Sequence, residues 1–144
     1  MKKLLLTLSA SLLALQLTAA ELKWLTDLPT AQAQAKKEKK MVMLNFTGSD
    51  WCGWCTKLKK DVFSTKEFNE YAAANLVLVE VDFPRTKKLG AKQEAANDAL
   101  MAKHKVQGFP TLIVLNADGH QVGQLGYEAT PQPFIAKLEV ARKK

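Results

Sequence analysis

The amino-acid sequence predicts an α/β domain with a mixed central sheet and helices on both faces. Three apolar runs of strand length, at residues 41–46, 76–83 and 111–115, alternate with stretches of helical composition. Helical segments join the first two runs, which favours a parallel pair of strands. The third run is followed by a turn signal and an alternating strand, which favours an antiparallel hairpin.

The first half of the chain predicts strands separated by helices, with the cysteines at the start of the second helix. Pro29 fits the first turn of a helix, and the Ala, Gln and Lys content through Lys40 favours that conformation. A polar loop at 47–50 follows the first apolar run. The expected elements are an edge strand at 22–25, a helix at 29–40, a buried strand at 41–46 and a helix from 52 to about 62.

The second half begins and ends with helix signals. Ser64-Thr65-Lys66-Glu67 is typical of a capping box, and Pro131 opens a terminal helix with Phe134, Ile135 and Leu138 on its apolar face. The expected elements are a helix at 64–74, a buried strand at 76–83, a helix at 90–104, strands at 111–115 and 121–127, and the terminal helix.

The first twenty residues have the composition of a secretory signal peptide. Lys2 and Lys3 form a positive region, residues 4–17 are mostly apolar, and Thr18-Ala19-Ala20 offers small residues for cleavage. A membrane anchor is the alternative, but the apolar stretch is shorter than the roughly 20 residues of a spanning helix and contains polar residues. We therefore expect a signal at 1–20, one domain at 21–144, no stable membrane insertion after cleavage, and a periplasmic or secreted protein.

The basic charge does not indicate a nucleic-acid partner. The formal net charge is +7, or +5 without the two lysines of the signal, and the excess is spread over short runs along the chain. A nucleic-acid-binding protein would gather such residues on one face with interleaved aromatic side chains. A solvated surface is the better interpretation, and we expect no nucleic-acid partner.

The chain has two cysteines, Cys52 and Cys55. A disulfide that closes so short a ring contributes only roughly 2 kcal/mol in the chain-entropy model, so the pair is better interpreted as a redox couple than as a structural crosslink. A zinc site would need His104 and His120, whose spacing is not that of a zinc finger, and Thr56 stands where a haem-attachment motif has histidine. We therefore expect no metal and no cofactor.

In this order of elements, the sequence resembles the thioredoxin-like family. Trp51-Cys52-x-x-Cys55 lies between a buried strand and a helix, where that family has its redox motif. Residues 106–111, Val-Gln-Gly-Phe-Pro-Thr, resemble the family's loop that ends in a cis-proline before the third core strand. The resemblance covers residues 22–143, and it implies a thioredoxin-like fold and an exported thiol–disulfide oxidoreductase.

The chemistry of disulfide exchange suggests different roles for the two cysteines. A helix N-terminus favours the thiolate of Cys52 through its unpaired N–H groups and its dipole, so we expect Cys52 to attack a substrate disulfide. Cys55, one turn further on and less exposed, is expected to resolve the mixed disulfide. Gly53 leaves room for a partner chain to approach.

The resemblance also implies a substrate surface around the motif. A cis bond between Phe109 and Pro110 would hold a backbone edge beside the sulfurs, where an extended substrate could pair, and an ordinary proline at a strand start is the alternative. Trp51 is expected to pack against the motif helix. Trp54 is expected to form an apolar contact surface, unless its ring folds into the core. The expected substrate-binding residues are thus Trp51, Gly53, Trp54, Phe109 and Pro110.

One position departs from thioredoxins proper, which carry a buried Asp in the strand before the motif that helps to deprotonate the resolving thiol. Asn45 takes that place here, and asparagine is neutral and cannot act as a general base. Either water or another group does this work, or resolution is slower. Asp50 is near in sequence, but its loop position indicates an exposed acid.

The Gly53-Trp54 pair between the cysteines bears on the direction of electron flow. It resembles neither the Gly-Pro of reducing thioredoxins nor the Pro-His of a strong oxidant, and Trp54 cannot donate a charged hydrogen bond. We expect a reductase of protein disulfides, with a thiol oxidase, a disulfide isomerase or a redox-inert binding module as alternatives. The expected partners are protein thiol and disulfide substrates and a redox protein that recycles the dithiol, and the chain is expected to be a monomer.

Overall fold

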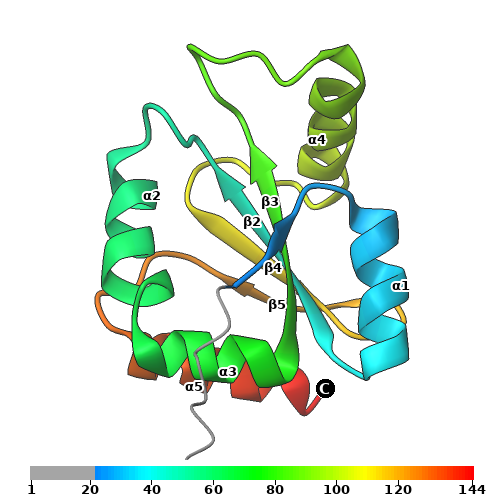
Figure 1. Ribbon diagram of the computed structural model, residues 1–144, viewed down its shortest axis with the longest axis vertical. Coiled ribbons are helices and arrows are strands. Elements are labelled where there is room, and N and C mark those ends of the chain that lie inside the picture. Colours follow the sequence, from blue (N-terminus) through cyan, green and yellow to red (C-terminus); the bar gives the residue numbers. More distant parts are fainter. Residues whose placement is uncertain (1–21) are drawn as a thin grey trace, which may run out of the picture.

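The computed structural model describes residues 22–144, so the signal peptide expected at 1–20 lies outside the described residues. This part of the chain forms one mixed sheet with helices on both faces, as the sequence predicts (Figure 1). Its elements are β1 (Trp24–Leu25), α1 (Leu28–Glu38), β2 (Met41–Thr47), α2 (Gly53–Leu58), the π-helix η1 (Lys59–Phe63), α3 (Lys66–Asn75), β3 (Leu76–Asp82), α4 (Ala91–Lys103), β4 (Thr111–Leu115), β5 (Gln121–Leu125) and α5 (Pro131–Arg142). None of these helices is long and apolar enough to cross a membrane.

Strand β2 lies in the middle of the five-stranded sheet, whose order is β1-β3-β2-β4-β5. It pairs with β3 in parallel and with β4 antiparallel, and β4 and β5 form the predicted hairpin. Because β2 is hydrogen-bonded on both sides, the loop that follows it leaves the sheet from a well-anchored position.

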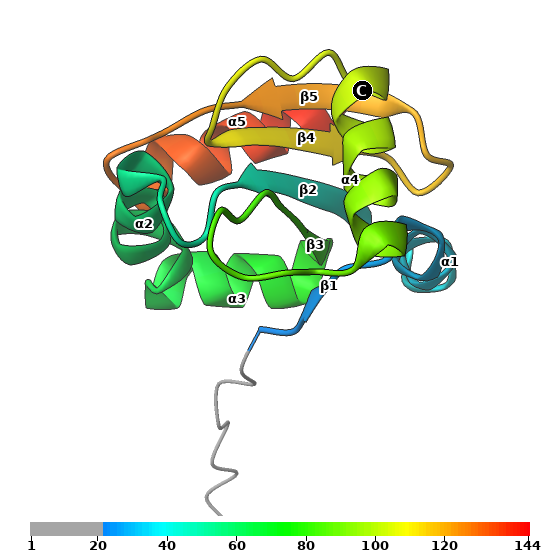
Figure 2. The same cartoon turned by 90° about the horizontal axis from the view of Figure 1, so that it is seen from above.

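The two faces of the sheet carry separate apolar clusters. Met41 and Met43 of β2 pack with residues of α2, η1, α3 and α5, whereas Val42, Leu44 and Phe46 pack with residues of α1 and α4. Figure 2 shows α1 and α4 at one end of the view, with α2, α3 and α5 at the other. The alternation explains why β2 is apolar throughout most of its length, since both of its faces are covered.

The helix starts follow from local capping, with one correction to the sequence prediction. The Asp27 side chain accepts from the Thr30 N–H over 2.9 Å at the start of α1. At α3 the N-cap is Thr65, whose hydroxyl accepts from the Phe68 N–H, and the predicted capping box is therefore one residue out of place. The reason is that the Ser64 hydroxyl donates to the Lys59 carbonyl over 2.9 Å and so closes the preceding helix.

Two further elements differ in detail from the prediction. The helix expected from 52 to about 62 changes at Lys59 into the π-helix η1, which no sequence signal indicated. Strand β5 ends at Leu125, two residues before Tyr127, whose hydroxyl donates to Asp61 over 2.8 Å. On α5, Phe134 and Leu138 are fully buried, as expected.

Candidate redox site

The two cysteines form a disulfide at the start of the helix that follows the central strand. Cys52 is the N-cap of α2, and the Cα atoms of Cys52 and Cys55 are 5.2 Å apart. The Cys55 N–H donates to the Cys52 sulfur over 3.2 Å. A donor in this position favours negative charge on the Cys52 sulfur once the disulfide is opened.

Both cysteines are nearly buried. Each exposes 7% of its surface, so the expectation that Cys55 is less exposed than Cys52 is wrong for the disulfide form. The crosslink thus joins two residues of equal exposure. Gly53 is different, because a methyl group placed there would meet no atom within 4 Å. The face beside the disulfide is therefore open at Gly53.

Trp51 packs against the loops that follow β3 and precede β4, which differs from the expected packing against the motif helix. Its Nε1 donates to the Phe83 carbonyl over 2.7 Å, and its ring lies edge-on to Phe109 with the centroids 5.9 Å apart. The Arg85 guanidinium lies 3.9 Å from the ring centroid. These loops offer the indole a hydrogen-bond acceptor and a cation, which explains its position. Glycine is needed at Gly48, where a Cβ would lie 2.4 Å from the indole.

Asp82 anchors the loop that leads from β2 to Cys52. This buried carboxylate at the end of β3 accepts from the Ser49 N–H over 2.8 Å and from the Ser49 hydroxyl over 2.6 Å, and it pairs with the Lys87 ammonium at 2.8 Å. Burial by itself would raise the pKa of Asp82, but the bonds from Lys87 and Ser49 outweigh it and lower that pKa. Asp82 is therefore a charged anchor for the loop.

Asp50, on the loop before Cys52, in turn binds the loop that follows β3. Its carboxylate accepts from the Arg85 N–H over 2.9 Å, from the Thr86 N–H over 2.7 Å and from the Thr86 hydroxyl. These bonds, with the Thr86 hydroxyl first, hold the pKa of Asp50 well below its usual range. The residue is exposed, as expected, yet it is engaged in ordering a loop that lies 35 positions away in sequence.

The Phe109–Pro110 peptide bond is cis, which confirms the expectation drawn from the family resemblance. Phe109 stacks on Phe83 with the ring centroids 5.2 Å apart, in addition to its edge contact with Trp51. The proline loop therefore lies beside the loop that carries the Trp-Cys motif.

Trp54 points outward, so the alternative that its ring folds into the core is wrong. It is 59% exposed and its ring meets Tyr127 edge-on, with the centroids 5.0 Å apart. Within the described residues only three large apolar side chains are exposed, and two of them are Trp51 and Trp54. The third is Val140 on α5. Exposed apolar surface is thus concentrated at the motif.

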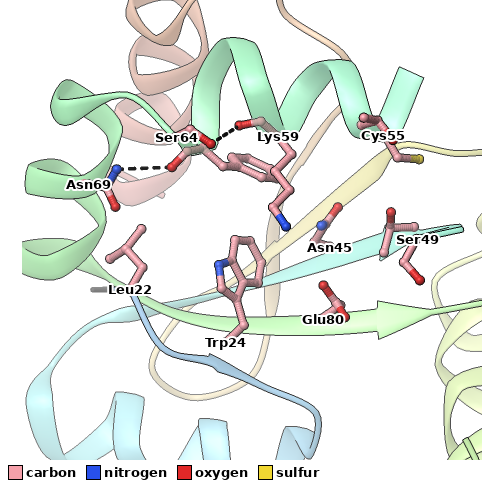
Figure 3. A pocket seen from close by; sticks show the side chains of 12 residues that line it. Leu22, Trp24, Asn45, Ser49, Cys55, Lys59, Ser64, Asn69 and Glu80 are labelled. Atoms are coloured by element: carbon pink, nitrogen blue, oxygen red, sulfur yellow. Dashed lines mark hydrogen bonds between the residues drawn. The ribbon is translucent and has the colours of Figure 1, made fainter. Parts of the chain in front are cut away.

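A cavity of about 390 Å³ lies on the inner side of Cys55. Figure 3 shows Asn45 of β2, Glu80 of β3 and Lys59 of η1 around the same space, with Cys55 at one end. Sequence reasoning singled out Asn45 but missed Lys59 and Glu80. Glu80 interrupts the otherwise apolar run 76–81, which is a signal that could have identified it.

Comparison with known proteins agrees with this geometry. A model of the thioredoxin-like domain matches residues 28–142. The chain is also 36% identical over 128 residues to the disulfide bond reductase DsbH of Chlamydia pneumoniae, which covers 88% of this chain and 76% of that protein. The chain belongs to the thioredoxin-like family.

Two further comparisons concern the fold and the activity class. A solved structure of DsbH oxidoreductase matches with a TM-score of 0.82 at 34% identity, covering 99% of this chain and 94% of that one. The thiol:disulfide interchange protein DsbD of Vibrio cholerae serotype O1 is 32% identical over 117 residues, which are 79% of this chain but only 18% of DsbD. The fold is thioredoxin-like, and with the Cys52–Cys55 pair the protein is a thiol–disulfide oxidoreductase.

Substitution of Asp82 tests the charged anchor. Asp82→Asn is expected to lower the free energy of unfolding by about 1–2 kcal/mol at neutral pH, because Ser49 and Lys87 lose a charged acceptor. The folded-state pKa of Asp82 lies below its ordinary value of 3.8, so its contribution is complete well above that pH and is lost as the pH falls through the folded-state pKa.

Urea unfolding of both proteins measures this effect at about pH 7 and about pH 3. The difference between wild type and Asp82→Asn is expected to shrink at the lower pH. A difference of equal size at both pH values would contradict the anchoring role of the charge.

Proposed function

We propose that this protein is a periplasmic or secreted reductase of protein disulfides that works through the Cys52–Cys55 dithiol. One juxtaposition carries the proposal: the disulfide at the start of α2 has an open glycine, an exposed Trp54 and a cis-proline loop around it. The Chlamydia relative is named a disulfide bond reductase, which supports the reducing direction. The composition of residues 1–20 supports export.

In this reaction the Cys52 thiolate attacks one sulfur of a substrate disulfide. A Cys52–substrate disulfide forms, and the other substrate sulfur leaves as a thiolate. Cys55 then loses its proton and attacks the Cys52 sulfur, which releases the second substrate thiolate and forms the Cys52–Cys55 disulfide. Two electrons pass to the substrate, and a redox partner returns them by the reverse exchange. The name of DsbD, a thiol:disulfide interchange protein, supports a partner of this kind.

The substrate lies, in this proposal, across Trp51, Gly53, Trp54, Phe109 and Pro110. Gly53 leaves space for the approaching chain, and the backbone groups of Phe109 pair with an extended segment of the substrate. Trp54 supplies apolar contact at little cost, because its ring is already exposed and ordered against Tyr127. All of these residues come from one chain, which supports the proposal that the protein works as a monomer.

The roles of the two cysteines are separable by substitution. Cys52→Ser is expected to abolish reduction of a disulfide-linked peptide, whereas Cys55→Ser is expected to accumulate a mixed disulfide through Cys52, since no thiol remains to resolve it. Mass spectrometry of the trapped adduct measures this, with Thr56→Ser as a matched control beside the motif. A Cys52→Ser variant that keeps full activity or partner binding would favour a redox-inert binding module.

The redox potential distinguishes a reductase from the alternatives. Equilibration of the Cys52–Cys55 couple with glutathione is expected to give a potential of about −230 to −270 mV, in the range of glutaredoxins and thioredoxin. A value of about −120 mV would instead indicate a thiol oxidase, and a value of about −180 mV an isomerase.

Trp54 tests the substrate surface without touching the reacting atoms. Trp54→Ala is expected to lower kcat/KM for a protein disulfide by about tenfold, mainly through KM, because an exposed aromatic anchor is lost. Reduction of a small linear disulfide such as bis(2-hydroxyethyl) disulfide is expected to stay unchanged. Val140→Ala is the matched control, since Val140 is 60% exposed but lies on α5. Equal losses for both substrates would contradict a role in substrate contact.

A further inference from the structure

The apolar core on one face of the sheet ends before it reaches the disulfide. On the face that packs under η1 and α3, β2 presents Met41 and Met43, and β3 presents Leu76 and Leu78. Side chains alternate along a strand, so the next positions on this face are Asn45 and Glu80, which are direct partners in the register of β2 and β3. The face is therefore apolar at one end and polar at the end nearest the cysteines.

The cavity lies over this polar end. Cys55 of α2 and Lys59 of η1 are four residues apart, which places both on the same side of the helical segment above Asn45 and Glu80. In Figure 3, the Lys59 ammonium, the Asn45 side chain and the Glu80 carboxylate are all directed into this space. At about 390 Å³ the cavity has room for several water molecules.

Asn45 gives an independent indication that a hydrogen-bond donor occupies this space. The residue is only 8% exposed, and its Oδ1 atom has no hydrogen-bond partner within the described part of the chain. A buried oxygen of this kind requires a donor, and either water in the polar cavity or the Lys59 ammonium can supply it.

Two charged residues, Lys59 and Glu80, line the cavity, and Lys59, as an ammonium, cannot accept a proton. Asp82 lies outside this lining and is already engaged by Ser49 and Lys87. No hydrogen bond or ion pair within residues 22–144 engages the Glu80 carboxylate. The other strands and α2 contribute no acidic group to this lining, so Glu80 supplies its one carboxylate.

We propose that Glu80 accepts, through water in this cavity, the proton that Cys55 loses when it resolves a mixed disulfide. The proposal rests on the proposed function. The Cys55 thiol gives its proton to a water chain that protonates the Glu80 carboxylate, and the Cys55 thiolate attacks the Cys52 sulfur. The Cys52–Cys55 disulfide forms, and the bond from Cys52 to the substrate breaks. The substrate sulfur leaves with the bonding electron pair and takes a proton from solvent.

Lys59 lines the same cavity as Cys55 and Glu80, and Glu80 is the one carboxylate among the three. The acid that Asn45 lacks is thus supplied from the neighbouring strand. In this proposal Glu80 acts on Cys55 through water and does not touch the sulfur, so it is a positioning residue and not a catalytic one.

The test follows the two exchange steps separately across about pH 5 to 9. The first step, attack by Cys52, is measured in Cys55→Ser with and without Glu80→Gln, and the rates are expected to agree. The second step is measured in the protein with both cysteines, by rapid mixing of the reduced form with a disulfide-linked peptide. Glu80→Gln is expected to slow resolution about tenfold near neutral pH and to recover as hydroxide increases. Glu94→Gln, an exposed glutamate on α4, is the matched control.

A second variant distinguishes the loss of a proton acceptor from a structural effect of the Glu80 substitution. Placing the acid on the adjacent strand, in Asn45→Asp combined with Glu80→Gln, is expected to restore the pH profile of resolution. A Glu80→Gln protein with the wild-type profile, or one slowed equally at every pH, would overturn the proposal. If the wild-type protein formed no mixed disulfide at all, the proposed reductase function would fail instead.

Discussion

The loop that carries Cys52 depends on the carboxylate of Asp82, which is buried at the end of β3 and accepts two hydrogen bonds from Ser49. Asp50 makes the same kind of connection in the opposite direction, to the backbone of Arg85 and Thr86. The motif loop thus supplies a carboxylate to the loop that follows β3, and the end of β3 supplies one to the motif loop, so the two loops form one unit. Trp51 completes this unit through its hydrogen bond to the Phe83 carbonyl, so the start of α2 is held from several sides.

The two sides of the disulfide have different surroundings. On the outer side lie the exposed rings of Trp51 and Trp54 and the open face of Gly53, which suit contact with another chain. On the inner side lies the polar cavity with Asn45 and Glu80. In our proposals, substrate contact belongs to the outer side and proton transfer to the inner side. This division allows a bulky apolar substrate to bind without displacing the water that serves Cys55.

Much of the fold could be predicted because its signals are local. The strands at 41–47 and 111–115 are continuous apolar runs, and the cis bond at Pro110 followed from a short motif. The errors have physical causes beyond the local sequence. The N-cap of α3 is Thr65 and not Ser64, because the Ser64 hydroxyl donates to the preceding helix. Trp51 packs away from the motif helix because its indole donates to a carbonyl on a distant loop.

The sequence by itself determined the order of the elements and the chemistry of the site, because periodicity and the spacing of Cys52 and Cys55 are properties of neighbouring residues. Only the tertiary structure decided which acidic residues anchor the motif loop and which one faces the cavity beside Cys55. Asp50 and Asp82 reach loops more than thirty positions away, and Glu80 lies beside Asn45 because of the parallel register of β2 and β3. Such register is set only when two strands distant in sequence pair and match their buried faces, so the sequence of one strand alone does not specify it.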